Sequence, residues 1–296
     1  MKEQIYVSTP VHYHAEPEFE ASLAEAFRTS KKARELGIVR NVSFGDSLIE
    51  RVRNTHISDF LERKDCKWFI SLDADLVLFN NKEGDNLIDI MVGHDLEFVG
   101  GVYPIKKMPI RPASVAMDAG GHRKLFDPDA GLVEMRWLST GCWCLRRDTV
   151  ERMAEAYKEL WYDGDGDVHG GKPLFGAYLI NIIPIFANGK LFRKLPSEDW
   201  AFCHRWSQLG GKIWADPRIR LGHVGKFVYQ MPTIRKTDEQ AKSADHSDNA
   251  NGREAVAARE ADPVIAEAGR LHRARLAVGR EAAPACADER PDAVPA

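Results

Sequence analysis

The clearest hydrophobic pattern in the chain surrounds two aspartates. Residues 69–79, FISLDADLVLF, are predominantly apolar on both sides of Asp73-Ala74-Asp75. A short apolar run of this kind predicts a central strand that is buried on both faces. Because side chains alternate faces along a strand, we expect Asp73 and Asp75 on the same side. Two carboxylates at that position are costly without a cation, and a divalent metal that carries a phosphorylated ligand is the natural candidate.

Strand and helix patterns alternate through the segment that precedes these aspartates. Residues 4–9 predict a first strand, and about 38–44 predict a second. The helix between them has an apolar stripe formed by Phe19, Leu23 and Phe27. Ser47 with Glu50 predicts a capping box at the start of the next helix. This β-α-β-α-β order predicts an α/β fold with a parallel sheet and helices on both faces, so Thr9 and the aspartates should lie at the ligand-binding edge.

The second half of the domain shows shorter elements. A strand is expected at 96–102, and 111–146 is expected to mix strands and turns. Ser197 predicts the start of a helix that Gly210-Gly211 ends. We expect KIWAD, residues 212–216, to be the last strand, with His223 just after it.

Composition changes after Tyr229 and sets the expected domain boundary. The tail contains no Phe, Tyr or Trp and is rich in Ala, Arg, Glu and Asp. Such a segment cannot bury much apolar surface. We therefore expect a folded domain at 1–232 and a largely disordered tail at 233–296, with a loose helix around 252–281.

Overall composition excludes several classes of protein. The 296 residues carry a formal net charge of −3, which gives no global attraction to nucleic acid. The five cysteines form no CxxC pair, so neither a disulfide framework nor a zinc module is indicated. No apolar run has the length of a membrane span, and the start MKEQIYVSTP is strand-like rather than a signal peptide. We expect a cytoplasmic protein without integral membrane association.

Four local motifs follow one another in a fixed order. They are RVRN at 51–54, DAD at 73–75, SEDW at 197–200 and LGHVG at 221–225. Together they resemble the GT-A class of glycosyltransferases, which move a sugar from a nucleotide-diphosphate donor to an acceptor. The likeness covers nearly all of 1–229 and is closest to small, single-domain bacterial and phage-type members. It implies a Rossmann-like three-layer sandwich with a mostly parallel central sheet.

The resemblance implies a metal site. Asp75 would bind a divalent cation, and Asp73 would reach the water shell of the metal or the ribose of the donor. His223 would be the third protein ligand. A mixed oxygen and nitrogen set favours Mn²⁺ over Mg²⁺, because imidazole suits softer ions.

The same resemblance implies how the donor and acceptor are held. Arg53 and Asn54 would contact the base or diphosphate of the donor, with Thr9 beneath the base. Gly141 would let the backbone approach the donor sugar.

On the acceptor side, Asp199 matches the general base that deprotonates the acceptor hydroxyl. Glu198 beside it lies at a predicted helix N-terminus, where the dipole favours ionised carboxylates. Tyr103, Lys106 and Trp200 would line the acceptor side. An aspartate base of this type implies inversion at the anomeric carbon. The acceptor class stays open: a lipid-linked glycan, a protein, a small molecule or a modified DNA base.

Three other functions remain as alternatives. In a haloacid-dehalogenase-type phosphohydrolase, Asp73 would be the nucleophile and Asp75 the acid/base. That motif normally ends the first strand of its fold, whereas two βα units precede it here. A sugar-nucleotide nucleotidyltransferase usually has a Gly-rich loop after its first strand, but this chain has STPVHYH at 8–14. A non-catalytic donor-binding module would have no base, and Asp199 argues against it.

Overall fold

The structure is a computed structural model that describes residues 3–80, 84–117, 123–124, 131–187 and 190–231. The chain divides into two units, the larger formed by 1–183 with 194–235 and the smaller by 184–193 with 236–296. The predicted tail at 233–296 and its helix lie outside the described residues. Within those residues, no helix has the length and apolar character needed to cross a membrane.

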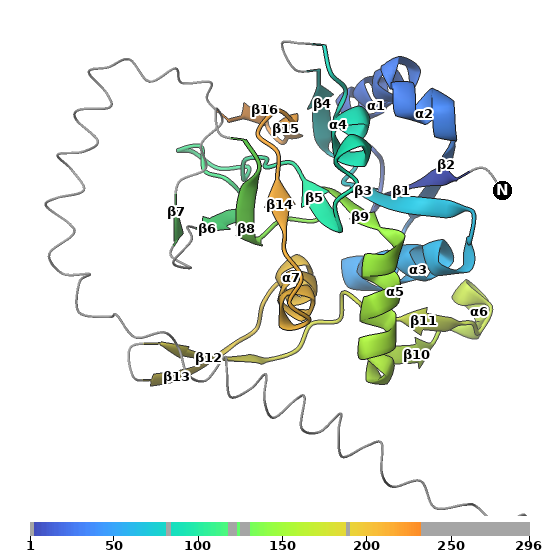
Figure 1. The fold of residues 1–296 in the computed structure, drawn as a ribbon, viewed down its shortest axis with the longest axis vertical. Coiled ribbons are helices and arrows are strands. Elements are labelled where there is room, and N and C mark those ends of the chain that lie inside the picture. The colour runs from blue at the N-terminus through green and yellow to red at the C-terminus, as the bar shows by residue number, and fades with distance from the viewer. Residues whose placement is uncertain (1–2, 81–83, 118–122, 125–130, 188–189, 232–296) are drawn as a thin grey trace, which may run out of the picture. The chain divides into compact units, whose positions relative to one another are not determined.

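A nine-stranded sheet forms the centre of the larger unit (Figure 1). In spatial order its strands are β2 (Ile38–Phe44), β1 (Gln4–Val11), β3 (Cys66–Leu72), β9 (Cys142–Arg146), β5 (Phe98–Gly100), β14 (Trp214–Ala215), β8 (Val133–Trp137), β6 (Val115–Met117) and β7 (Arg123–Lys124). Strands β2, β1 and β3 pair in parallel, as do β5 and β14. β9 lies between β3 and β5 and is antiparallel to each of them, so β3 and β5 run in the same direction.

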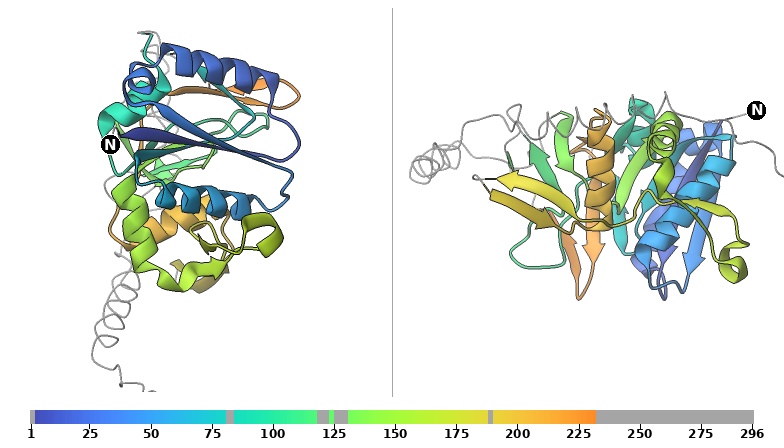
Figure 2. Two further views of the ribbon diagram at one scale, coloured as in Figure 1. Left: turned by 90° about the vertical axis from the view of Figure 1, so that its right-hand side faces the viewer. Right: turned by 90° about the horizontal axis from the view of Figure 1, so that it is seen from below.

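Helices cover both faces of this sheet, which gives the predicted three-layer α/β sandwich (Figure 2). One face carries α1 (Pro17–Thr29), α2 (Lys31–Leu36) and α4 (Leu87–His94), and the other carries α3 (Ile49–Glu62), α5 (Arg147–Ala156) and α7 (Glu198–Gln208). Strand alternation explains the two cores, because Ile5 and Val7 pack on the first side and Tyr6 on the second.

Shorter elements complete the description. One small sheet contains β4 (Leu76–Phe79), β15 (Arg220–Val224) and β16 (Val228–Gln230), with β15 in the middle. Two hairpin pairs are β10 (Trp161–Asp163) with β11 (Pro173–Phe175) and β12 (Ile183–Ala187) with β13 (Lys190–Lys194). The remaining helices are the 3-10 helix Lys158–Leu160 and α6 (Gly166–His169). Most of the β12–β13 pair belongs to the smaller unit.

The aspartates lie in a turn, which corrects one prediction. β3 ends at Leu72, and the chain then turns into β4, a strand of a different sheet. The Asp73 N–H donates to the Gly141 carbonyl at 3.0 Å, and the Leu76 N–H donates to the Asp73 carbonyl at 3.3 Å. The prediction that the two aspartates belong to the strand, so that strand alternation sets their orientation, is therefore wrong.

Two other predictions differ from the structure. The expected capping box of Ser47 and Glu50 is absent, because α3 begins at Ile49 with Leu48 at the N-cap and no side-chain cap. The KIWAD strand is not the last one. His223 lies inside β15, opposite Leu76 of β4, so strand pairing rather than a following loop fixes its position.

His56 of α3 is buried between two hydroxyl groups beneath the sheet. Its Nδ1 lies 2.7 Å from Ser8 Oγ, and its Nε2 lies 2.6 Å from Ser43 Oγ. Burial lowers the pKa of His56 from its ordinary value of 6.5 to about 4, more than nearby Asp59 raises it. The imidazole is therefore neutral in the folded protein at pH 7.

This burial predicts an acid-sensitive stability. Between pH 6.5 and about 4 the unfolded chain binds a proton on His56 that the folded chain does not, so stability falls as pH is lowered through this window. The full difference corresponds to about 3 kcal/mol. Urea unfolding at a series of pH values should show this slope, and His56→Gln should reduce it. The variant His14→Gln, at an exposed site, should keep it. An unchanged slope in His56→Gln would contradict the assignment.

Candidate functional site

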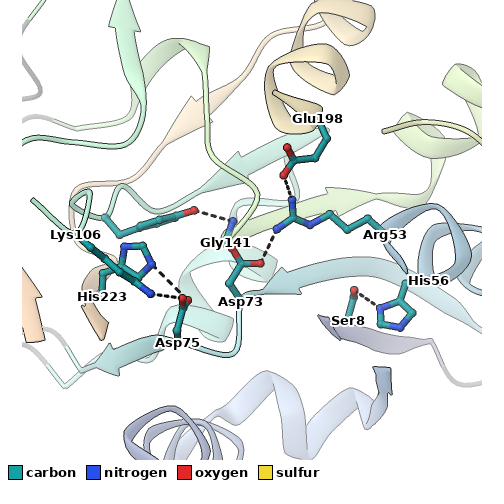
Figure 3. Close-up of polar contacts among 10 residues, drawn as sticks. Ser8, Arg53, His56, Asp73, Asp75, Lys106, Gly141, Glu198 and His223 are labelled. Atoms are coloured by element: carbon teal, nitrogen blue, oxygen red, sulfur yellow. Dashed lines mark hydrogen bonds and ion pairs between the residues drawn. The ribbon is translucent and has the colours of Figure 1, made fainter. Parts of the chain in front are cut away.

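The turn at 73–75 lies where β3, α3, α7 and β15 approach one another, and its two carboxylates take different partners (Figure 3). Asp73 binds Arg53 of α3, whereas Asp75 faces His223 of β15 and Lys106. The site therefore has two halves joined by three residues of backbone.

In the first half, Asp75 sits between two nitrogen groups. Its Oδ2 accepts a hydrogen bond from Lys106 Nζ at 2.5 Å, and its Oδ1 lies 3.4 Å from His223 Nε2. Burial alone would raise the pKa of Asp75, but the contacts from His223 and Lys106 outweigh burial and lower it. Asp75 is thus ionised at neutral pH.

The orientation of His223 directs its Nε2 atom toward Asp75. Its Nδ1 lies 2.8 Å from the Pro104 carbonyl oxygen, which can only accept, so Nδ1 carries the proton. The Tyr103 ring packs edge-on against the imidazole with centroids 5.1 Å apart and holds it in place. In the neutral imidazole Nε2 then bears no hydrogen. Two acceptors, Nε2 and Asp75 Oδ1, face each other, an arrangement that a shared proton or a cation stabilises.

These residues fit a divalent cation. Asp75 Oδ1 is buried and has no hydrogen-bond partner in the described structure. Two ligands about 2.1 Å from one cation lie roughly 3.0 to 3.4 Å apart, which matches the separation of Oδ1 and Nε2. Across the described residues, no group of three His, Cys, Asp or Glu side chains converges on one point. Asp75 and His223 would therefore hold the ion as a pair, with the other positions left to donor oxygens and water.

In the second half, one buried guanidinium joins two carboxylates. Arg53 Nη2 donates to Asp73 Oδ1 at 2.7 Å, and Nη1 donates to Glu198 Oε1. Arg53 is 4% exposed. Burial would lower the pKa of its guanidinium, but the charges of Asp73 and Glu198 raise it above its ordinary value. Glu198, predicted on the acceptor side, is thus held by Arg53, which was itself predicted to contact the donor.

Gly141 lies directly against Asp73 and leaves no room for a side chain. Its N–H donates to Tyr103 Oη at 3.1 Å. A Cβ atom at this position would lie 2.5 Å from Tyr103 Oη and 2.9 Å from Asp73 Oδ2. Glycine is therefore required for the close packing of this loop on Asp73.

The start of α7 presents Asp199 and Trp200. Ser197 is the N-cap residue, as the sequence predicts, and Asp199 Oδ1 accepts hydrogen bonds from the Trp200 N–H at 2.8 Å and from Ser197 Oγ. Burial raises the pKa of Tyr103, and the negative charges of Asp73 and Asp199 raise it further.

Thr9 and Asn54 are both buried within the fold. Asn54 Oδ1 accepts the Tyr178 N–H at 2.9 Å, and its Nδ2 lies 3.4 Å from Tyr162 Oη. Thr9 Oγ1 has no hydrogen-bond partner among the described residues. Their contacts with a donor stay predictions.

Some features of the site were not predicted from the sequence. The Pro104 carbonyl, which sets the tautomer of His223, and the pairing of Arg53 with Glu198 depend on contacts across more than a hundred positions. Trp137, which stacks on Trp200, precedes Gly141 by four residues. Its proximity in sequence to the Gly141 loop is the signal that could have identified it.

Comparisons with known proteins give structural similarity only. No protein-family model and no curated protein matches the sequence. Among solved structures, A197 from STIV matches at 13% identity with a TM-score of 0.45, over 80% of this chain and 98% of that one. GalNAc-T7, solved with UDP, GalNAc and Mn²⁺, matches at 12% identity with a TM-score of 0.37, over 83% of this chain and 47% of that one. An apo UDP-glucose pyrophosphorylase matches at 10% identity with a TM-score of 0.34, over 85% of this chain and 82% of that one. This chain thus spans about half the length of GalNAc-T7.

We predict that Arg53 is a main determinant of stability. Arg53→Met leaves Asp73 and Glu198 partly buried without their cation, and the expected loss in free energy of unfolding is about 3 to 5 kcal/mol. Urea unfolding measures this loss. Arg51→Met on the same helix is the matched control, because Arg51 is half exposed and pairs with Asp46 at the surface. It should cost about 1 kcal/mol or less. Equal stability of the two variants would refute the role of Arg53.

Proposed function

We propose that this chain is a metal-dependent glycosyltransferase that uses a nucleotide-diphosphate sugar. The observation that carries the proposal is the convergence of Asp75 Oδ1 and His223 Nε2, 3.4 Å apart, beside the turn that Gly141 contacts. The order of motifs in the sequence, which resembles GT-A glycosyltransferases, supports the same function independently of this geometry.

Different residues of the chain would have different roles in binding the donor. Asp75 and His223 would hold Mn²⁺ or Mg²⁺, which when bound offsets the charge of the departing nucleoside diphosphate. Lys106 places an ammonium group on the same carboxylate, where it can also attract phosphate oxygens. Gly141, which carries no side chain, would let the donor sugar approach the backbone of its loop.

In this proposal Asp199 acts as the general base. Its Oδ1 accepts two hydrogen bonds at the start of α7, while Oδ2 makes none within the described residues. Oδ2 is therefore available to take the proton of the acceptor hydroxyl. The acceptor oxygen then forms a bond to the anomeric carbon as the bond from that carbon to the phosphate oxygen breaks, which gives inversion and releases the nucleoside diphosphate.

The phosphohydrolase alternative fits these contacts less well. It requires Asp73 to attack phosphorus as a nucleophile. Asp73 instead binds the buried Arg53 through Oδ1, and its Oδ2 lies against Gly141. A nucleophile needs an open approach, which this packing does not provide.

A donor-binding experiment tests the metal pair. We expect at least one of UDP-, GDP- and TDP-sugars to raise the melting temperature by roughly 5 °C at saturating concentration, and only with Mn²⁺ or Mg²⁺ present. Asp75→Asn and His223→Asn should abolish the shift, because each removes one metal ligand. Asn at 223 can still donate to the Pro104 carbonyl.

The exposed variant His14→Asn is the control and should behave as the parent protein does. A shift that is independent of metal, or that survives both substitutions, would refute the metal pair. Pyrophosphate release from a nucleoside triphosphate and a sugar phosphate would instead identify a nucleotidyltransferase.

A second experiment tests the base. Asp199→Asn should lower the turnover of the donor about 10²- to 10⁴-fold while donor binding is retained. Release of nucleoside diphosphate during slow donor hydrolysis measures this, with water in place of the acceptor. Asp148→Asn is a matched control, because Asp148 also lies in the first turn of a helix but is largely exposed. Equal turnover in Asp199→Asn and the parent would overturn the base assignment.

A further inference from the structure

A pair of stacked tryptophans lies beside the proposed base. Trp137 ends β8 and Trp200 lies in the first turn of α7, with ring centroids 4.0 Å apart and an angle of 17° between the rings. The Arg136 guanidinium lies 4.6 Å from the Trp137 centroid. Both indoles are partly exposed, and Arg136 is exposed. Among the described residues no other ring or cation contacts Trp200.

The indole N–H groups of this pair are unused. Trp161 and Trp206 each donate to a backbone carbonyl, at 3.3 and 3.0 Å. Within the described chain neither Trp137 nor Trp200 donates to any acceptor, and neither Nε1 is among the buried atoms that lack a partner. Both N–H groups are therefore accessible to a ligand, and an indole N–H that is withdrawn from water normally finds an acceptor.

The location of the pair connects it to the chemistry. Trp200 follows Asp199 directly, and Trp137 precedes Gly141 by four residues. Asp199 and Trp200 lie together in the first turn of α7. A group that rests on the pair is thus near the carboxylate proposed to take the acceptor proton.

We propose that Trp137 and Trp200 form a stacking subsite for a sugar ring, so that the acceptor is a carbohydrate. This inference rests on the proposed function and names its acceptor class. One face of a pyranose ring presents C–H groups that pack on an aromatic surface, while its hydroxyls accept from indole N–H and from Arg136. A nucleobase can also stack on tryptophan. The carboxylate of Asp199, which pairs with no cation within the described residues, would repel the phosphates of a nucleic acid strand, so a neutral sugar fits better.

Ligand-observed NMR by saturation transfer tests the subsite on the full chain. The probes are methyl glycosides of glucose, galactose, mannose and N-acetylglucosamine, with a thymidine oligonucleotide as the competing class. We expect at least one glycoside to bind, and Trp200→Leu to weaken it about three- to tenfold. Trp200→Phe keeps an aromatic face and should retain most of the binding. Trp161→Leu, a partly exposed tryptophan of β10, should bind as the parent does.

Each other outcome decides against the proposal. It is overturned if no glycoside binds the parent, if Trp200→Leu binds as well as the parent, or if only the oligonucleotide binds in a Trp200-dependent way. The metal-dependent thermal shift with nucleotide-sugars is measured separately on the same parent protein. A positive shift without glycoside binding would leave the glycosyltransferase in place and remove only the carbohydrate acceptor.

Discussion

The buried guanidinium of Arg53 is the contact on which the rest of the site depends. It links α3 to the turn after β3 through Asp73 and to the start of α7 through Glu198. Because Asp73 is held, the turn is fixed, and the carboxylate of Asp75, two residues later, then faces His223. Holding Glu198 fixes the first turn of α7, which carries Asp199 and Trp200. A planar, permanently charged group with several donors suits this role better than lysine does.

The charges of the site explain why it should attract a cation. Four carboxylates, those of Asp73, Asp75, Glu198 and Asp199, gather here, whereas two side chains with permanent positive charge, Arg53 and Lys106, contact them. Because Nδ1 of His223 already donates to a carbonyl, its neutral form adds no charge. The carboxylates of the site thus outnumber the two cationic side chains that contact them. A bound cation or a proton would reduce this imbalance.

The sequence predicted the parts of the site that depend on local pattern. The apolar strand ending in Asp73-Ala74-Asp75, the α/β layering and the N-cap at Ser197 follow from periodicity and capping chemistry. The placement of the two aspartates within the strand and the capping box at Ser47 and Glu50 were wrong. The distant Gly141 carbonyl accepts the Asp73 N–H just after the strand ends, and Asp46 Oδ1 accepts the Leu48 N–H at 2.9 Å beside the start of α3. The position of His223 within β15 depends on its pairing with β4, which spacing along the chain does not encode.

The two halves of the site differ in how much their structure can change. The half that contains Asp75 and His223 is built on strand pairing and a tight turn, so its geometry tolerates little change. The half that Arg53 joins includes the start of α7, where the partly exposed Trp200 stacks on Trp137 at the end of β8. Asp199 belongs to the same helical turn as Trp200, so under the proposed function the acceptor would be positioned by the element that carries the base. Selection of the acceptor and the chemistry would then be coupled through one helix terminus, which Arg53 holds in place through Glu198.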